Sequence, residues 1–272
     1  MLIDSHCHLH DREFFSEEQA GEMLERAHKN GVMKIVCIGT DPEDSLAARD
    51  FAAEHEGVYW TYGIHPENAT SEPDSWPRTS GPSPWAAGAN PRAAALRNAT
   101  NLDSLVAIGE VGLDYHSERY NREAQIRLFE EMLQLAVDND LPLSFHVRNA
   151  FEDFFPVVAN FPNVRGVVHS FTDSKKTLRR ILETTDFYVG VNGLATYSTL
   201  PTPPLERILL ETDAPFLTPA PFRGIINEPG YILNIAQWLS DKLGTDFETI
   251  ERETTKNAER LYRFSDTVIR ES

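Results

Sequence analysis

The chain has 272 residues, and its 42 Asp and Glu against 25 Lys and Arg give a formal net charge of −17. This length suits a single α/β barrel, which takes about 250 residues, and a hydrophobic content of 41% is enough for a large core. No segment approaches the roughly 20 consecutive apolar residues of a membrane helix. The N-terminus also lacks the pattern of a signal peptide. We therefore expect a globular protein without a membrane-spanning segment or a signal peptide.

Charge and cysteine content bear on the substrate and on the cellular location of the protein. Proteins that grip nucleic acid usually present a basic face, and this chain is acidic overall, although a small basic pocket can coexist with an acidic exterior. Only two cysteines occur, Cys7 and Cys37. A disulfide framework is therefore excluded, and we expect a reducing, cytoplasmic location.

Short apolar segments alternate with helix-length segments along the chain, which indicates parallel strands joined by helices. The first helix illustrates the signals, because Ser16 can cap its start and Gly31 can end it. We expect strands within residues 1–8 and at 32–38, 58–62, 105–108, 141–145, 164–168, 187–191 and 207–211. We expect helices at 16–30, 42–55, 121–139, 150–160, 175–183, 231–243 and 248–261.

Two connections depart from a regular repeat. Residues 69–90 are rich in proline and predict an irregular insertion or long loop after the third strand, with 92–98 as a helical remnant. Residues 194–206 contain three prolines and are too few for the usual crossover helix. We therefore predict one domain over 1–272, a (β/α)8 TIM barrel with a Pro-rich insertion and a shortened connection between its seventh and eighth strands.

Residues with metal-binding side chains stand where these strands end. His6 and His8 share one face of the first strand because side chains alternate along a strand. In a barrel the C-terminal ends of all strands meet at one face, so ligands far apart in sequence converge. The set comprises His6, His8, His65, Glu110, His146, His169 and Asp213. Imidazole and carboxylate ligands suit zinc or manganese, and a bridging carboxylate can hold two ions for ester hydrolysis.

Each member of the set also has an ordinary structural explanation. His146 could be a hydrogen-bonded core histidine, Asp213 a helix N-cap, and Glu110 the start of a tight turn between glycines. The convergence of the whole set at different strand ends is what favours a site. The other histidines lie on helices or in loops, and we assign them no metal role: His10, His28, His55 and His116.

Six segments along nearly the whole chain carry a family resemblance. They are 4–9 (Asp-Ser-His-Cys-His-Leu), 63–66 (Gly-Ile-His-Pro), 109–114 (Gly-Glu-Val-Gly-Leu-Asp), 146–148 (His-Val-Arg), 169–171 (His-Ser-Phe) and 211–215 (Glu-Thr-Asp-Ala-Pro). Together they resemble the TatD family of metal-dependent deoxyribonucleases, which belongs to the amidohydrolase-like barrels.

The resemblance implies a two-metal site acting on DNA. One ion would be held by His6, His8, Glu110 and Asp213, and the other by Glu110, His146 and His169. Asp213 and Glu110 would be catalytic, with Asp213 orienting or deprotonating the attacking water. Substrate would be bound by His65, Arg148 and Arg223. The ions would be zinc, manganese or magnesium.

The chain leaves the family pattern at positions that bear on substrate. The stretch 223–229 is Arg-Gly-Ile-Ile-Asn-Glu-Pro, so Ile225 and Ile226 stand where the family usually has two cations. Asp173 replaces a usual glycine and is expected to add a carboxylate beside the metal centre. Because phosphate contacts supply much of nucleic-acid affinity, we expect weaker DNA binding than is usual in the family.

Three functions follow from these observations. The leading hypothesis is a metal-dependent hydrolase of DNA phosphodiesters acting on an exposed or single-stranded end. The second is hydrolysis of a small ester, lactone or aminoacyl ester on the same site. The third is a non-catalytic descendant that binds a partner through residues 69–90. The intact set of metal ligands argues against this third hypothesis.

Overall fold

The structure, a computed structural model, describes residues 1–69 and 104–264. Its centre is a sheet of eight parallel strands in sequential order, as the sequence predicted. The strands are β1 (Leu2–Cys7), β2 (Val32–Cys37), β3 (Val58–Tyr62), β4 (Leu105–Asp114), β5 (Leu143–Arg148), β6 (Gly166–Val168), β7 (Tyr188–Val191) and β8 (Ile208–Leu210). Backbone hydrogen bonds of 2.8 Å from Asp213 N to His6 O and from His8 N to Ala214 O join the last strand end to the first. The sheet thus closes into the barrel of a (β/α)8 TIM-barrel fold.

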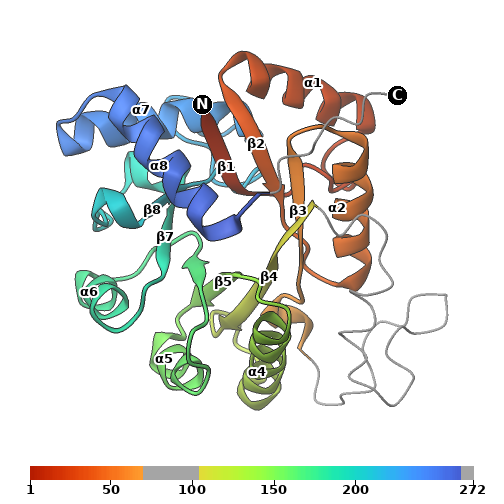
Figure 1. Cartoon of the computed structure of the whole chain (residues 1–272), viewed down its shortest axis with the longest axis vertical. Helices are drawn as coiled ribbons and strands as arrows, with labels where there is room; N and C mark the ends of the chain where they lie inside the picture. Colours follow the sequence, from red (N-terminus) through yellow and green to blue (C-terminus); the bar gives the residue numbers. More distant parts are fainter. Residues whose placement is uncertain (70–103, 265–272) are drawn as a thin grey trace.

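Helices surround this barrel (Figure 1). They are α1 (Glu17–Lys29), α2 (Pro42–Glu54), α4 (Arg122–Asp138), α5 (Phe151–Ala159), α6 (Lys175–Thr184), α7 (Ile232–Leu243) and α8 (Phe247–Tyr262). Helix starts follow the capping residues, since Ser16 and Gln19 form a capping box on α1 and Asp41 caps α2 ahead of Pro42. None of the helices in the described part of the chain combines the length and apolar character that crossing a bilayer requires.

The core has two parts, because successive strand residues face opposite sides of the sheet. The larger cluster lies between the strands and the helices and includes Cys7, Cys37 and Trp60. The smaller cluster, with Ile3 and Val36, is joined by Leu261 and Tyr262 of α8, among others. Both cysteines are free and buried.

Two strands are longer than the sequence indicated, and both corrections concern the site. The expected strand at 105–108 continues as β4 to Asp114, so Glu110 lies within a strand and does not begin a tight turn. Pairing with β5 continues from Val111 to Asp114 after an irregularity in register, and Gly112 allows it: a Cβ there would lie 2.0 Å from the His146 carbonyl oxygen. Likewise β5 runs to Arg148, which places His146 inside it.

The shortened connection between β7 and β8 is confirmed. Only two 3-10 helices, Gly193–Tyr197 and Leu205–Arg207, lie there in place of an α-helix. Neighbouring helices cover part of the gap: Trp238 of α7 borders a small hollow beside β7. The Asn257 side chain of α8 donates 2.9 Å hydrogen bonds to the carbonyls of Leu205 and Ile208. The predicted insertion at 69–90, beyond its first residue, and the predicted helix at 92–98 lie outside the described residues.

Candidate metal centre

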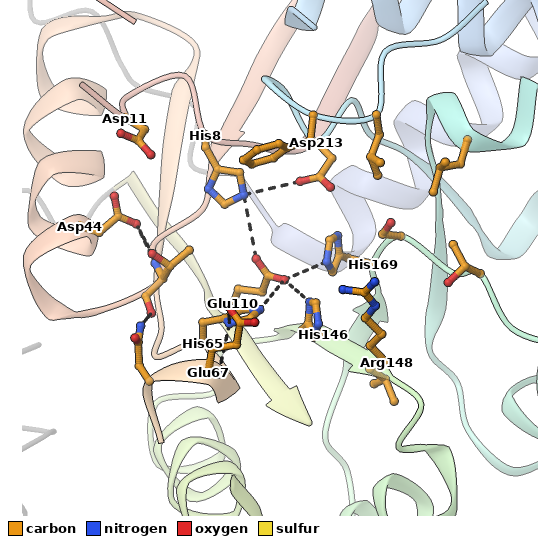
Figure 2. Close-up of a pocket in the computed structure, with 18 residues that line it drawn as sticks. His8, Asp11, Asp44, His65, Glu67, Glu110, His146, Arg148, His169 and Asp213 are labelled. Carbon is orange, nitrogen blue, oxygen red and sulfur yellow. Dashed lines mark hydrogen bonds and ion pairs between the residues drawn. The ribbon is translucent and has the colours of Figure 1, made fainter. Parts of the chain in front are cut away.

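The predicted ligands come together at the C-terminal ends of the strands (Figure 2). Most of them border a cavity of about 620 Å³, whereas His6 is buried and does not border it. His6 and Glu110 lie within β1 and β4, while His169 and Asp213 directly follow β6 and β8. The ligand residues that border the cavity are His8, Glu110, His146, His169 and Asp213.

Glu110 is the centre of the cluster because its two carboxylate oxygens face different histidines. Oε2 lies 3.5 Å from His6 Nε2 and 4.0 Å from His8 Nε2. Oε1 lies 2.6 Å from His146 Nδ1 and 2.9 Å from His169 Nε2. Asp213 Oδ1 completes the first group at 3.5 Å from the Nε2 atoms of both His6 and His8. One carboxylate therefore joins two sets of potential ligand atoms.

Hydrogen bonds behind the cavity orient the first two imidazoles. His8 Nδ1 lies 3.1 Å from the carbonyl oxygen of Ile38, which can only accept, so Nδ1 carries the proton of the neutral ring. His6 Nδ1 lies 3.3 Å from Ser144 Oγ. Both Nε2 atoms are left to face Glu110 and Asp213, and within the described residues the buried His6 Nε2 has no hydrogen-bond partner. Such a nitrogen, aimed at carboxylates, fits a metal ligand.

The second set likewise places a histidine between two carboxylates. His146 Nε2 lies 2.9 Å from Asp114 Oδ2, and donation of its proton to that carboxylate leaves a lone pair on Nδ1. That lone pair would face Glu110 Oε1 at 2.6 Å. Two acceptors at this distance repel each other unless a proton or a metal ion lies between them. Three groups of described residues are close enough to hold a metal ion: His6, His8 and Glu110; His65, Glu110 and His146; His6, His169 and Glu211.

The charges of the cluster also suit cation binding. Burial would raise the pKa of Glu110, but the charge of His169 and the hydrogen bonds of His146 and His169 hold it well below its ordinary value. Burial would also raise the pKa of Asp213, but His8 and His6 lower it below its ordinary value. Burial lowers the pKa of His65 to about 4, so that imidazole is neutral. Two carboxylates are thus ionised among the imidazoles.

Asp114 is a residue to which the sequence gave no role. It is buried and bonded to His146, and its even spacing from Glu110 along one strand was a signal that both face the same side. Glu211 is a second such carboxylate: it is fully buried, and its Oε1 lies 3.7 Å from His169 Nδ1. Carboxylates behind metal-binding histidines fix the ring and increase its basicity.

We expect Asp114→Asn to weaken metal binding by roughly 10- to 100-fold, because loss of the carboxylate frees the His146 ring and lowers its basicity. Metal titration of the demetallated protein by calorimetry measures this. Asp138→Asn is the matched control, since that carboxylate accepts from Gln134 at the surface of α4. An unchanged affinity in a folded Asp114→Asn protein would contradict the role.

Two of the three predicted substrate-binding residues border the cavity. His65 and Arg148 both border the cavity, and His65 Nε2 lies 3.7 Å from Glu110 Oε1. Arg223 does not border it; its guanidinium lies over the Tyr197 ring, 4.5 Å from the centroid, in a neighbouring hollow that shares Leu217.

The expectation that Asp173 adds a carboxylate beside the metal centre was wrong. Its carboxylate accepts 2.5 Å hydrogen bonds from Ser174 N and Thr177 Oγ1 at the start of α6, and it does not border the cavity. A carboxylate is favoured there by the unpaired N–H groups and the positive end of the helix dipole. Among the other histidines, His10 is buried and bonded to Asp44 at 2.9 Å.

Comparison with known proteins agrees with this architecture. Residues 3–263 match the family model described as TatD related DNase. The chain belongs to the TatD family. A relative from Bacillus subtilis, the uncharacterized metal-dependent hydrolase YabD, is 32% identical over 97% of this chain and 100% of its own length. The 3'-5' ssDNA/RNA exonuclease TatD of Pantoea ananatis is 30% identical, covering 96% of this chain and 99% of that protein.

Solved structures give the same fold. The crystal structure of YjjV, a TatD homolog from Escherichia coli, superposes with a TM-score of 0.81 at 26% identity, covering 97% of this chain and 98% of the other. The chain is a TatD-type metal-dependent hydrolase, an enzyme class that acts on ester bonds, and the alternative of a non-catalytic binding protein is set aside.

Proposed function

We propose that this TatD-family hydrolase cleaves phosphodiester bonds of DNA from an exposed or single-stranded end, using two divalent ions. The observation that carries the proposal is the position of the Glu110 carboxylate, whose two oxygens face separate sets of histidine nitrogens. His6, His8, Glu110 and Asp213 would hold one ion, and Glu110, His146 and His169 the other. When bound, such a pair of zinc, manganese or magnesium ions supplies Lewis-acid activation of water and of the phosphoryl oxygen.

The chain's own residues would then orient the reactants. Asp213 borders the cavity as a carboxylate and would orient the attacking water and accept its proton. The neutral His65 and the charged Arg148 face the same cavity and would contact the phosphate. DNA as substrate agrees with the name of the Pantoea relative, a 3'-5' ssDNA/RNA exonuclease.

A second function, hydrolysis of a small ester, lactone or aminoacyl ester, is favoured by the side chains in and beside the cavity. Ile225 and Ile226, which border the neighbouring hollow, are 54% and 59% exposed where the family usually has cations. Asp11, Asp44 and Glu67 border the cavity, and Arg148 is the only Lys or Arg among its described lining residues. This distribution limits phosphate contacts with a long polyanion.

Hydrolysis assays after metal removal and reloading distinguish the two functions. Protein stripped by chelation would be incubated with manganese, magnesium or zinc and with single-stranded DNA, a small phosphodiester, a lactone or an aminoacyl-tRNA. We expect no DNA hydrolysis without metal, progressive shortening of the DNA with metal, and two ions per chain by elemental analysis. Intact DNA together with rapid hydrolysis of the lactone or aminoacyl ester would replace the first function by the second.

Two broader expectations remain proposals beside this one. We propose that one barrel domain accounts for residues 1–272, and that the protein works in the cytoplasm, as its cysteine content indicates.

A further inference from the structure

An exposed aromatic ring borders the cavity next to a metal-binding histidine. Phe216 is 47% exposed, and its ring centroid lies 6.3 Å from that of His8. Phe14, which is 43% exposed, meets the Phe216 ring edge-on with centroids 5.3 Å apart and an interplanar angle of 82°. Two large apolar rings are therefore left partly in water at the mouth of the site, although burial would stabilise the fold.

The turn that carries Phe216 is held rigidly. Leu217 has φ of 56°, a left-handed conformation that a leucine adopts only when its surroundings impose it. The fully buried Asn227 provides this constraint, since its Nδ2 donates to Phe216 O at 2.6 Å and to Thr212 O at 2.8 Å. The ring is thus positioned before any substrate arrives, as a binding surface should be.

Charge indicates which part of a substrate fits this surface. Asp11 borders the same cavity, so a phosphate is disfavoured beside it. A flat, uncharged group is favoured, and every nucleobase offers a π-face to an aromatic ring. Because this chain offers few cations for phosphate contacts, stacking must supply more of its affinity for a nucleic-acid end.

We propose that Phe216, supported edge-on by Phe14, stacks on a nucleobase of a nucleotide that flanks the scissile phosphodiester. The inference rests on the proposed hydrolysis of DNA and adds a specificity-determining residue to it. A paired base in a duplex is already stacked on its neighbours, so this surface selects unpaired ends.

The test compares oligonucleotides that have, or lack, one base beside the scissile bond, the missing base being replaced by a tetrahydrofuran residue. We expect wild-type protein to show a KM roughly 5- to 100-fold lower for the complete oligonucleotide. Phe216→Leu should lose this preference by raising KM for the complete substrate while leaving the base-free substrate unchanged, and Phe216→Trp should keep it. Tyr120→Leu is the matched control, because Tyr120 is 42% exposed and does not border the cavity.

The outcomes separate this inference from the proposed function. DNA hydrolysis in which Phe216→Leu keeps the wild-type preference, or slows both substrates equally, would overturn the stacking role alone. Failure of wild-type protein to hydrolyse either oligonucleotide with any of the metals would overturn the proposed function and the inference with it.

Discussion

Glu110→Gln should lower kcat/KM by about a thousandfold. The change keeps the shape of the side chain but replaces one of the two oxygens that face the separate sets of histidines. An amide cannot bridge two cations as a carboxylate does, so elemental analysis should show the loss of at least one ion per chain. Steady-state kinetics at saturating metal measures the loss of activity.

The control for this experiment is Glu118→Gln, which alters an exposed glutamate in the loop after β4. Glu118→Gln should keep wild-type activity and metal content, and circular dichroism should show that both proteins are folded. Wild-type turnover by Glu110→Gln with saturating metal would show that the bridging role is wrong.

Asp213→Asn should reduce kcat by about a thousandfold as well, because it removes both a ligand atom and the proposed acceptor of the water's proton. Asparagine is the informative replacement here. Asp213 has φ of 57°, and asparagine tolerates this left-handed conformation better than alanine does. The loss of activity is then attributable to the carboxylate and not to backbone strain.

Metal content sharpens the interpretation of Asp213→Asn. Glu110, His146 and His169 remain in place, so we expect the variant to retain at least one ion, measured by elemental analysis beside the wild-type protein. A folded Asp213→Asn protein that turned over at the wild-type rate would remove Asp213 from the mechanism.

The barrel was predictable because local patterns agreed with the final fold. The predicted strand at 58–62 is β3 to the residue, and α1 begins after Ser16 and ends before Gly31, as the capping signals indicated. The β4 strand was predicted too short because Gly109 and Gly112 are typical of turns. Pairing with β5 outweighed that local tendency and carried the strand to Asp114.

The convergence of the predicted ligands could be expected from the sequence, but their arrangement could not. His6, His8, Glu110, His146, His169 and Asp213 all reach one cluster, since the barrel brings strand ends together. Asp173 shows the limit of such reasoning: it follows His169 closely in sequence, yet its carboxylate bonds to the start of α6. Arg223 borders a neighbouring hollow for the same reason, because loop geometry decides where a side chain points.

The sequence by itself determined the barrel, the convergence of the predicted ligands and the lack of a crossover helix before β8. These follow from strand and helix periodicity and from the chemistry of imidazole and carboxylate, which are local properties. Only the tertiary structure decided that Glu110 divides its oxygens between two sets of histidines, that Asp114 lies behind His146, and that Phe216 stays exposed beside His8. Those facts are distances and exposures set by packing between residues far apart in the chain, and local patterns do not fix them.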